Sequence, residues 1–155
     1  MAELRITPEH PESATAVALL DRYYRELELR FPGGFDLART SAAPTAELLA
    51  PHGRFLVARQ GARAVGCGGV RRLSQDTAEI KRMWVDPAAR GLGVGRSLLA
   101  ALEQGAVELG CRTVRLDTAA SLAEALALYR SADYAEIPSY NDNPYAAHWL
   151  EKRVG

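Results

Sequence analysis

The sequence AEIKRMWVDPAARGLGVG, at residues 78–95, joins a strand pattern to a glycine-rich helix start. Residues 78–85 are typical of a strand, and the Asp-Pro pair at residues 86–87 ends it. A helix is predicted after the glycines, because apolar residues follow at helical spacing until Gly110. The free backbone amides and positive dipole end of such a helix converge on one point. The stretch therefore predicts an anion-binding loop, with a tight loop that binds nothing as the alternative.

Before this unit, the sequence predicts a strand, a helix and a hairpin. A short strand is expected at residues 4–6, and Ser13 can cap a helix that ends before Phe31. Residues 55–58 and 64–70 flank a Gly61 turn that is typical of a hairpin. One helix face is expected to carry the apolar residues Val17, Leu20, Tyr24 and Leu27, and a helical turn is expected at residues 46–50.

After the unit, strand and helix patterns alternate. A strand is predicted at residues 113–117, and Ser121 and Glu124 have the spacing of a capping box for a helix at residues 122–132. Asp133 takes the helix-stop position that glycine usually occupies in the left-handed conformation. The last two strands are expected at residues 134–137 and 148–154. We therefore expect one α/β (α+β) domain, residues 1–155, with a mixed central sheet of about six or seven strands flanked by helices.

Composition narrows the class of protein. The 155 residues are 48% hydrophobic and 25% charged, which is typical of one globular domain. Nineteen basic and nineteen acidic residues give no net charge, which argues against a nucleic-acid partner. The start of the chain lacks a signal-peptide pattern and no stretch is long enough to span a membrane, so we expect a cytoplasmic protein without a membrane partner. Cys67 and Cys111 lack metal-site spacing; we expect both to be buried and no metal to be bound.

Two other phosphate-binding loops fit the glycines poorly. In a Rossmann dinucleotide site the third glycine would fall on Arg96, and residues 86–90 would intervene where an immediate tight turn is needed. A Walker loop requires a closing Gly-Lys-Ser/Thr, which this stretch lacks. The loop therefore favours a phosphate cradle of another kind.

Residues 78–95 resemble the acetyl-CoA-binding core of the GNAT superfamily of N-acetyltransferases. The resemblance continues in order through the helix, through Leu116-Asp117-Thr118 at the next strand end, and through ALALYRSADY at residues 125–134. It extends from about residue 55 to the carboxy terminus, with the acetyl-CoA-binding core at about residues 78–134. The sequence departs from the family at Leu122, where asparagine is common, and at Asp133, where glycine is usual.

The resemblance implies where acetyl-CoA would bind. The loop amides would hold the coenzyme A pyrophosphate along Arg90, Gly91, Leu92, Gly93, Val94, Gly95 and Arg96. The backbone of Met83, Trp84 and Val85 would pair with the pantetheine arm as an added strand does. A backbone amide in the same stretch would polarise the thioester carbonyl.

The resemblance also implies two catalytic residues. Tyr129 matches the tyrosine that many members use as general acid toward the departing thiolate; a phenol, with a pKa near ~10, stays protonated at neutral pH. Glu79 matches the position that serves several members as a base, through water, for the acceptor ammonium. The alternatives are that Tyr129 only packs in the core and that Glu79 is an ion-pair partner.

These features predict an acetyltransferase that moves the acetyl group of acetyl-CoA to a primary amine by direct attack in a ternary complex. The acceptor would be a small-molecule or peptide amine, and the resemblance makes a homodimer possible. Its pocket is expected to involve Tyr23, Tyr24, Phe31, Phe35 and the loop at residues 140–145. The alternative is a non-catalytic acyl-CoA sensor or interaction module.

Overall fold

The fold is described from a computed structural model, which covers residues 3–40 and 43–155. These residues form one seven-stranded sheet in the order β1-β2-β3-β4-β5-β7-β6. Within this sheet β4 and β5 pair in parallel and the other neighbouring strands pair antiparallel, which confirms the predicted mixed sheet. The strands are β1 (Leu4–Pro8), β2 (Gly53–Gln60), β3 (Arg63–Arg72), β4 (Thr77–Val85), β5 (Thr113–Thr118), β6 (Ala135–Ile137) and β7 (His148–Arg153).

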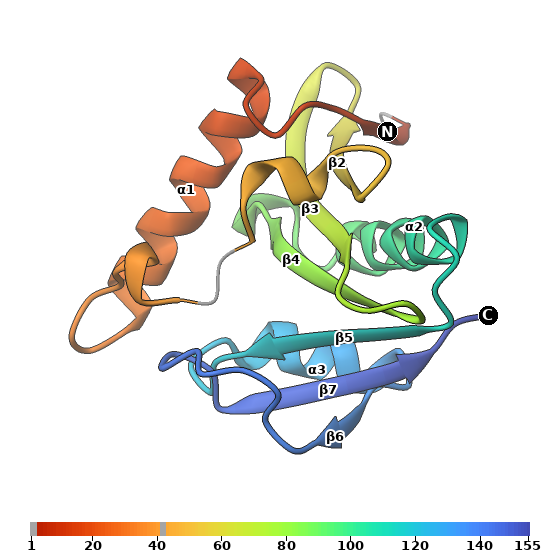
Figure 1. The fold of residues 1–155 in the computed structure, drawn as a ribbon. Coiled ribbons are helices and arrows are strands. Elements are labelled where there is room, and N and C mark those ends of the chain that lie inside the picture. Colours follow the sequence, from red (N-terminus) through yellow and green to blue (C-terminus); the bar gives the residue numbers. More distant parts are fainter. Residues whose placement is uncertain (1–2, 41–42) are drawn as a thin grey trace.

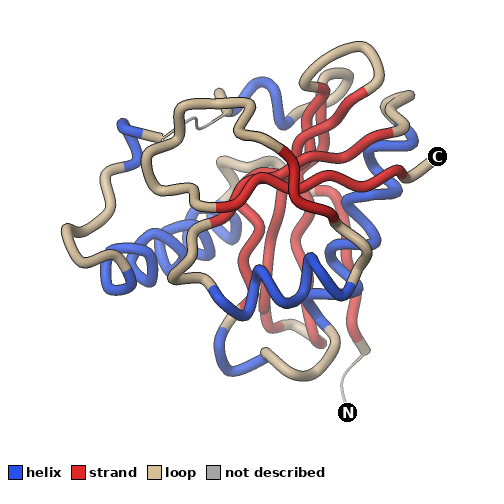
Figure 2. The backbone as a smooth tube through the Cα atoms, turned by 90° about the horizontal axis from the view of Figure 1, so that it is seen from below, coloured by secondary structure: helices blue, strands red, loops and turns tan. Residues whose placement is uncertain are grey.

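Helices cover both faces of the sheet, and the strands cross the middle of the molecule (Figure 2). Of the helices in the described residues, α1 (Ala14–Arg30) packs on one face, together with the short 3-10 helix η2 (Thr45–Leu48). On the opposite face pack α2 (Val94–Glu108) and α3 (Ala123–Ser131). Two further 3-10 turns are η1 (Leu37–Arg39) and η3 (Pro87–Ala89). No helix in the described ranges is both long and apolar enough to cross a membrane.

The alternation of side chains along β2 explains this layering. Phe55 and Val57 point into the cluster beneath α1, whereas Leu56, between them, belongs to the cluster beneath α2. A strand with period two places successive side chains on opposite faces, so a strand that is apolar throughout needs cover on both sides. Cys67 and Cys111 are both buried, which confirms their prediction as small core residues.

The buried face of α1 differs from the expected one. Val17 was expected in the core but is 47% exposed, whereas Leu20 and Leu27 are buried as predicted. Ala16 and Leu19 complete the buried stripe, so the buried face is rotated about the helix axis away from Val17. Ser13 caps the helix as predicted, accepting a hydrogen bond from the Ala16 amide at 3.1 Å.

The predicted helix ends have different outcomes. Asp133 has φ 74° and Gly110 has φ 86°, so both helix stops adopt the left-handed conformation that the sequence predicted. The predicted capping box at α3 is wrong: the cap residue is Leu122, which makes no side-chain cap bond. The Glu124 carboxylate forms an ion pair with Arg30 of α1 instead, and a tertiary contact has replaced a local one.

The two parallel strands separate after a short paired segment. β4 pairs with β5 only from Thr77 to Glu79, although β4 continues to Val85. β5 meanwhile stays paired with β7 along its whole length. The strands start together and run apart toward their carboxyl ends (Figure 1). The second half of β4 therefore has no strand partner on its β5 side within the described sheet.

Candidate functional site

A cavity of about 450 Å³ lies where β4 and β5 run apart. Residues of α1, the second half of β4, the glycine loop, the end of β5, α3 and the loop before β7 line it. The divergence exposes backbone amides and carbonyls of β4 that a paired strand would satisfy. An extended ligand with its own amide groups can pair with such an edge.

The glycine loop opens into this cavity at the start of α2. Gly91 and Gly93 have φ of 81° and 82°, a backbone region that glycine enters at little cost. Gly93 is the cap residue of α2 and no side chain caps the helix there. A methyl group built on Gly91 or Gly93 would meet no atom within 4 Å, so the space beside the loop is open. The loop therefore suits a phosphate group, which needs donors without side chains in the way.

Arg90 and Arg96 flank the loop, but their guanidinium groups have protein partners. Arg90 donates to both carboxylate oxygens of Glu26, at 2.9 and 3.0 Å, and to the Val85 carbonyl at 3.1 Å. Arg96 donates to the Ser131 hydroxyl at 2.8 Å. The loop is thus held to α1 on one side and to α3 on the other.

A bulge bends β4 where it leaves β5. Between the pairs of Cys67 with Trp84 and Gly69 with Lys81, β3 contributes one residue and β4 contributes two. Arg82 is one of the two and has φ 57°, which is rare for a residue with a side chain. Such a bulge increases the local twist and redirects side chains, which here accompanies the divergence of β4 from β5.

Tyr129 of α3 reaches the cavity from the side opposite α1. Its ring is buried, 7% exposed, and packs edge-on against Tyr134. Its hydroxyl has no hydrogen-bond partner among the described residues, although the residue lines the cavity. Burial raises the pKa of the phenol well above its usual range, and the nearby Asp117 carboxylate adds to this effect. The hydroxyl is therefore protonated and free to donate to a ligand.

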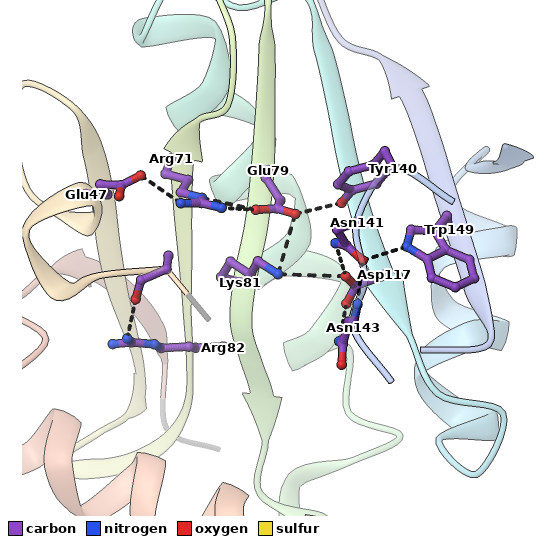
Figure 3. A network of polar contacts seen from close by, with 11 residues as sticks. Glu47, Arg71, Glu79, Lys81, Arg82, Asp117, Tyr140, Asn141, Asn143 and Trp149 are labelled. Atoms are coloured by element: carbon purple, nitrogen blue, oxygen red, sulfur yellow. Dashed lines mark hydrogen bonds and ion pairs between the residues drawn. The ribbon is translucent and has the colours of Figure 1, made fainter. Parts of the chain in front are cut away.

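Glu79 lies behind the cavity rather than in its wall. It is 1% exposed, and its carboxylate accepts from Arg71 at 2.9 and 3.0 Å and from the Tyr140 hydroxyl at 2.8 Å. The Lys81 ammonium group is 3.4 Å away. Figure 3 shows this carboxylate at the centre of a polar network that crosses β3, β4 and the loop before β7. Its role as a base stays a prediction.

Asp117, at the end of β5, was noted in the sequence as an acidic strand end but was not among the expected catalytic or binding residues. It lines the cavity and accepts hydrogen bonds from Asn141 at 2.6 Å and from Asn143 at 3.3 Å. The Lys81 ammonium group is 3.7 Å from it, on the other side of the divergence. An acidic side chain at the carboxyl end of a central strand, beside a parallel neighbour, is the signal that could have found it.

Comparisons with known proteins agree with this geometry. The family described as acetyltransferase (GNAT) matches residues 18–134. The chain is 34% identical over 138 residues to an IAA acetyltransferase of Azospirillum brasilense, covering 88% of this chain and 87% of that protein. The family match includes residues 18–30 of α1, the glycine loop and α3.

The chain belongs to the GNAT family.

One further relative and one solved structure are also similar to this acetyltransferase. The N-alpha-acetyltransferase RimI of Mycobacterium tuberculosis is 39% identical over 103 residues, 62% of this chain and 61% of that protein. The structure of yncA from Salmonella typhimurium, solved with its cofactor acetyl-CoA, has a TM-score of 0.70 over 99% of this chain and 95% of that one. At 17% identity that structural likeness concerns the fold. The GNAT family membership that residues 78–134 predicted is confirmed.

Most of the site residues that the GNAT resemblance implied lie together around the cavity of this acetyltransferase. Those that line the cavity are Met83, Trp84, Val85, Arg90, Gly91, Gly93, Gly95, Arg96 and Tyr129. Leu92 and Val94 do not line it: Leu92 is 59% exposed, and Val94 is buried in the core. Their backbone remains part of the loop. The described residues contain no group of three metal-ligating side chains.

Aromatic rings form the wall of the cavity next to α1. Tyr24 stacks on Phe35 with ring centroids 6.1 Å apart, and Tyr145 lies 4.9 Å from Phe31. These four residues line the cavity together with Tyr23, and their role as the acceptor pocket stays a prediction. Tyr140 does not line the cavity, since its hydroxyl is held by Glu79.

Proposed function

We propose that this GNAT protein transfers the acetyl group of acetyl-CoA to a primary amine by direct attack in a ternary complex. The observation that carries the proposal is the meeting of three features in one cavity: the open glycine loop, the unpaired half of β4 and the hydroxyl of Tyr129. The acceptor would be a small molecule or the amine of a peptide.

The glycine loop and the free edge of β4 would each bind a different part of acetyl-CoA. The backbone amides at Gly91 to Gly95 would hold the pyrophosphate, because the space beside Gly91 and Gly93 is open. The free edge of β4 at Met83, Trp84 and Val85 would pair with the two amides of the pantetheine arm. A β4 amide would also stabilise the oxygen that becomes negative when the amine attacks the thioester carbonyl.

Tyr129 would donate the proton that the leaving thiolate needs. Its hydroxyl has no competing partner in the described structure, and its raised pKa keeps it protonated. A general acid of this kind contributes typically about 10²–10⁴-fold to the rate. The amine attacks the carbonyl carbon, the carbon–sulfur bond breaks, and the phenol proton goes to sulfur. The proton that the attacking nitrogen loses in becoming an amide then passes through water to the phenolate and restores the phenol.

The acceptor ammonium must lose a proton before it attacks. Asp117 is the better placed carboxylate, because it lines the cavity and lies close enough to Tyr129 to affect its pKa. Glu79, the candidate from the sequence, is bound by Arg71 and Tyr140 and would act through Lys81 as a positioning residue. We propose Asp117 for the proton transfer and retain Glu79 as its rival.

Thiol release tests the proposal. Purified protein is mixed with acetyl-CoA and a panel of primary amines, and free thiol is measured together with the acetylated amine by mass spectrometry. Thiol released in step with acetylated amine supports the transfer. A sensor would bind acetyl-CoA in calorimetry and release no thiol with any amine, and that result would overturn the proposal.

A further inference from the structure

The cavity contains a guanidinium group that no described carboxylate neutralises. Arg82 donates to the Ala43 carbonyl at 2.7 Å, and its Nε is buried without a hydrogen-bond partner among residues 3–40 and 43–155. Within the same residues no carboxylate lies at ion-pair distance from it. A buried donor without a partner costs free energy that a ligand acceptor can recover.

The other cations of the cavity wall differ from Arg82. Lys81 lies between the carboxylates of Glu79 and Asp117. Arg30 and Arg90 share the carboxylates of Glu26 and Glu124. Arg96, bonded to Ser131, flanks the glycine loop, where the pyrophosphate would bind. Among these cations of the cavity wall, Arg82 is thus the one that has an unpaired hydrogen-bond donor and lies away from that loop.

Arg82 lies in the β4 bulge, and the whole stretch of β4 from Ile80 to Val85 lines the cavity. The positive φ of Arg82 is unfavourable for a residue with a side chain. The fold holds this conformation next to the point where β4 and β5 separate.

Arg82 and the aromatic wall line the same cavity. The charge of Arg82 lowers the pKa of the Tyr24 hydroxyl, against the larger raising effect of burial. Tyr24 continues through Phe35 to Phe31 and Tyr145 as a run of contacting rings. An apolar or aromatic side chain would pack on these rings while a negative group beside it reached Arg82.

We infer that the acceptor is a small amine that also carries a carboxylate and an apolar or aromatic side chain, an α-amino acid in the simplest case, and that Arg82 binds its carboxylate. This inference rests on the proposed acetyl transfer. The ammonium group would face Asp117 on β5 and the carboxylate would face Arg82 on β4, on opposite sides of the divergence. An internal peptide unit lacks the free α-carboxylate, so peptide amines are the weaker substrates.

Matched acceptors that differ only in the carboxylate test this inference. The pairs are L-phenylalanine with phenethylamine, L-tyrosine with tyramine, and L-leucine with 3-methylbutylamine. kcat/KM is measured for each member at saturating acetyl-CoA. Since a charged hydrogen bond is worth the equivalent of about 10–150-fold, kcat/KM of the amino acid should exceed that of its partner by about 10–100-fold in at least one pair.

Substitutions of Arg82 test whether this residue causes the preference for acceptors with a carboxylate. In Arg82→Met the ratio within that pair should fall toward one, because only the amino acid loses a contact; Arg82→Lys should give an intermediate ratio. Differences in amine basicity cancel when the two enzymes are compared. Arg5→Met, which removes an exposed charge on β1 outside the cavity, is the control and should retain the ratio.

The possible failures can be told apart. Equal or better use of the plain amines or of a peptide amine by the wild-type protein overturns the carboxylate inference and leaves acetyl transfer intact. An equal loss of both members in Arg82→Met assigns Arg82 to the transfer step and also overturns it. If no amine is acetylated, the proposed transfer fails, and the carboxylate site is then tested by calorimetry in the presence of coenzyme A. Binding of L-phenylalanine to the wild-type protein that is lost in Arg82→Met supports the carboxylate site. No binding of L-phenylalanine to the wild-type protein refutes it.

Discussion

Arg90 donates to both carboxylate oxygens of Glu26, at 2.9 and 3.0 Å, and so joins the glycine loop to α1. The same carboxylate also accepts from the Trp84 indole at 3.1 Å and pairs with Arg30. One acidic residue of α1 therefore holds β4, the loop and its own helix end. The loop that would bind the phosphates is positioned by a residue far from it in sequence.

Glu26→Gln should move stability and ligand affinity in opposite directions. Loss of the charge weakens several hydrogen bonds, so urea unfolding should show a loss of about 1–3 kcal/mol. The freed Arg90 becomes available to a phosphate, so calorimetry should show an affinity for acetyl-CoA that is about 2–5-fold higher. Glu108→Gln, at an exposed site of α2, is the control and should change neither quantity. A lower affinity in Glu26→Gln would contradict the availability of Arg90.

Gly93→Val should weaken acetyl-CoA binding at least about tenfold, because its side chain would fill the approach to the loop amides and disfavour φ 82°. The added atoms meet no protein group within 4 Å at the Cβ position, so core packing is retained. Gly33→Val, in an open loop with nothing within 4 Å and without a positive φ, is the control for the added bulk alone. Unchanged affinity in calorimetry would refute the phosphate cradle.

Tyr129→Phe and Tyr134→Phe should separate catalysis from stability. The turnover number of Tyr129→Phe should fall by about 10²–10⁴-fold with acetyl-CoA affinity nearly intact, because the variant lacks only the proton donor. Tyr134 donates to Glu103 at 2.8 Å outside the cavity wall, so Tyr134→Phe should lose about 1–2 kcal/mol of stability and retain turnover. Normal turnover in folded Tyr129→Phe would return this residue to a packing role.

Asp117→Asn and Glu79→Gln compare the two candidate bases in one pH–rate experiment. A variant that lacks the base should be slow at neutral pH and recover at high pH, where the free amine predominates. We expect this recovery in Asp117→Asn, and in Glu79→Gln a loss that stays the same at every pH, since that residue positions Lys81. The reverse pattern would make Glu79 the base. Wild-type rates in both variants would assign deprotonation to solvent.

Asp86 should stabilise the fold in a pH-dependent way. Burial raises the pKa of its carboxyl, but hydrogen bonds from the Ala88 amide and Arg22 and the charges of Arg22 and Arg63 outweigh burial, so the pKa is below its usual range. A carboxyl with a depressed folded pKa stabilises the fold above its unfolded pKa, near ~3.9, and this contribution is lost as pH falls through the folded value. Urea unfolding should show Asp86→Asn less stable than wild type at pH 7, with a gap that narrows below about pH 4. A gap independent of pH would contradict the charge effect.

Local signals explain which parts of this structure could be predicted. The strand at β4, the glycine loop, α2 and the left-handed Asp133 all follow from residues within a few positions of one another. The placement of Glu79 depends instead on Arg71 being opposite it in β3, which is a matter of register. Asp117 reaches the cavity only because β4 leaves β5 after Glu79, and no short stretch of sequence encodes that separation.

The free edge of β4 links the stability of the fold to the supply of a ligand. Backbone groups in the middle of a sheet are normally satisfied by the fold itself, but the second half of β4 has no strand partner on its β5 side within the described sheet. Under the proposed function, acetyl-CoA would complete this pairing. A molecule that binds only the folded chain at one hundred times its dissociation constant adds about 2.7 kcal/mol to the stability of that chain. If acetyl-CoA binds in this way, a cell short of it would hold a less stable form of the protein, and the amount of the protein would follow the supply of acetyl-CoA.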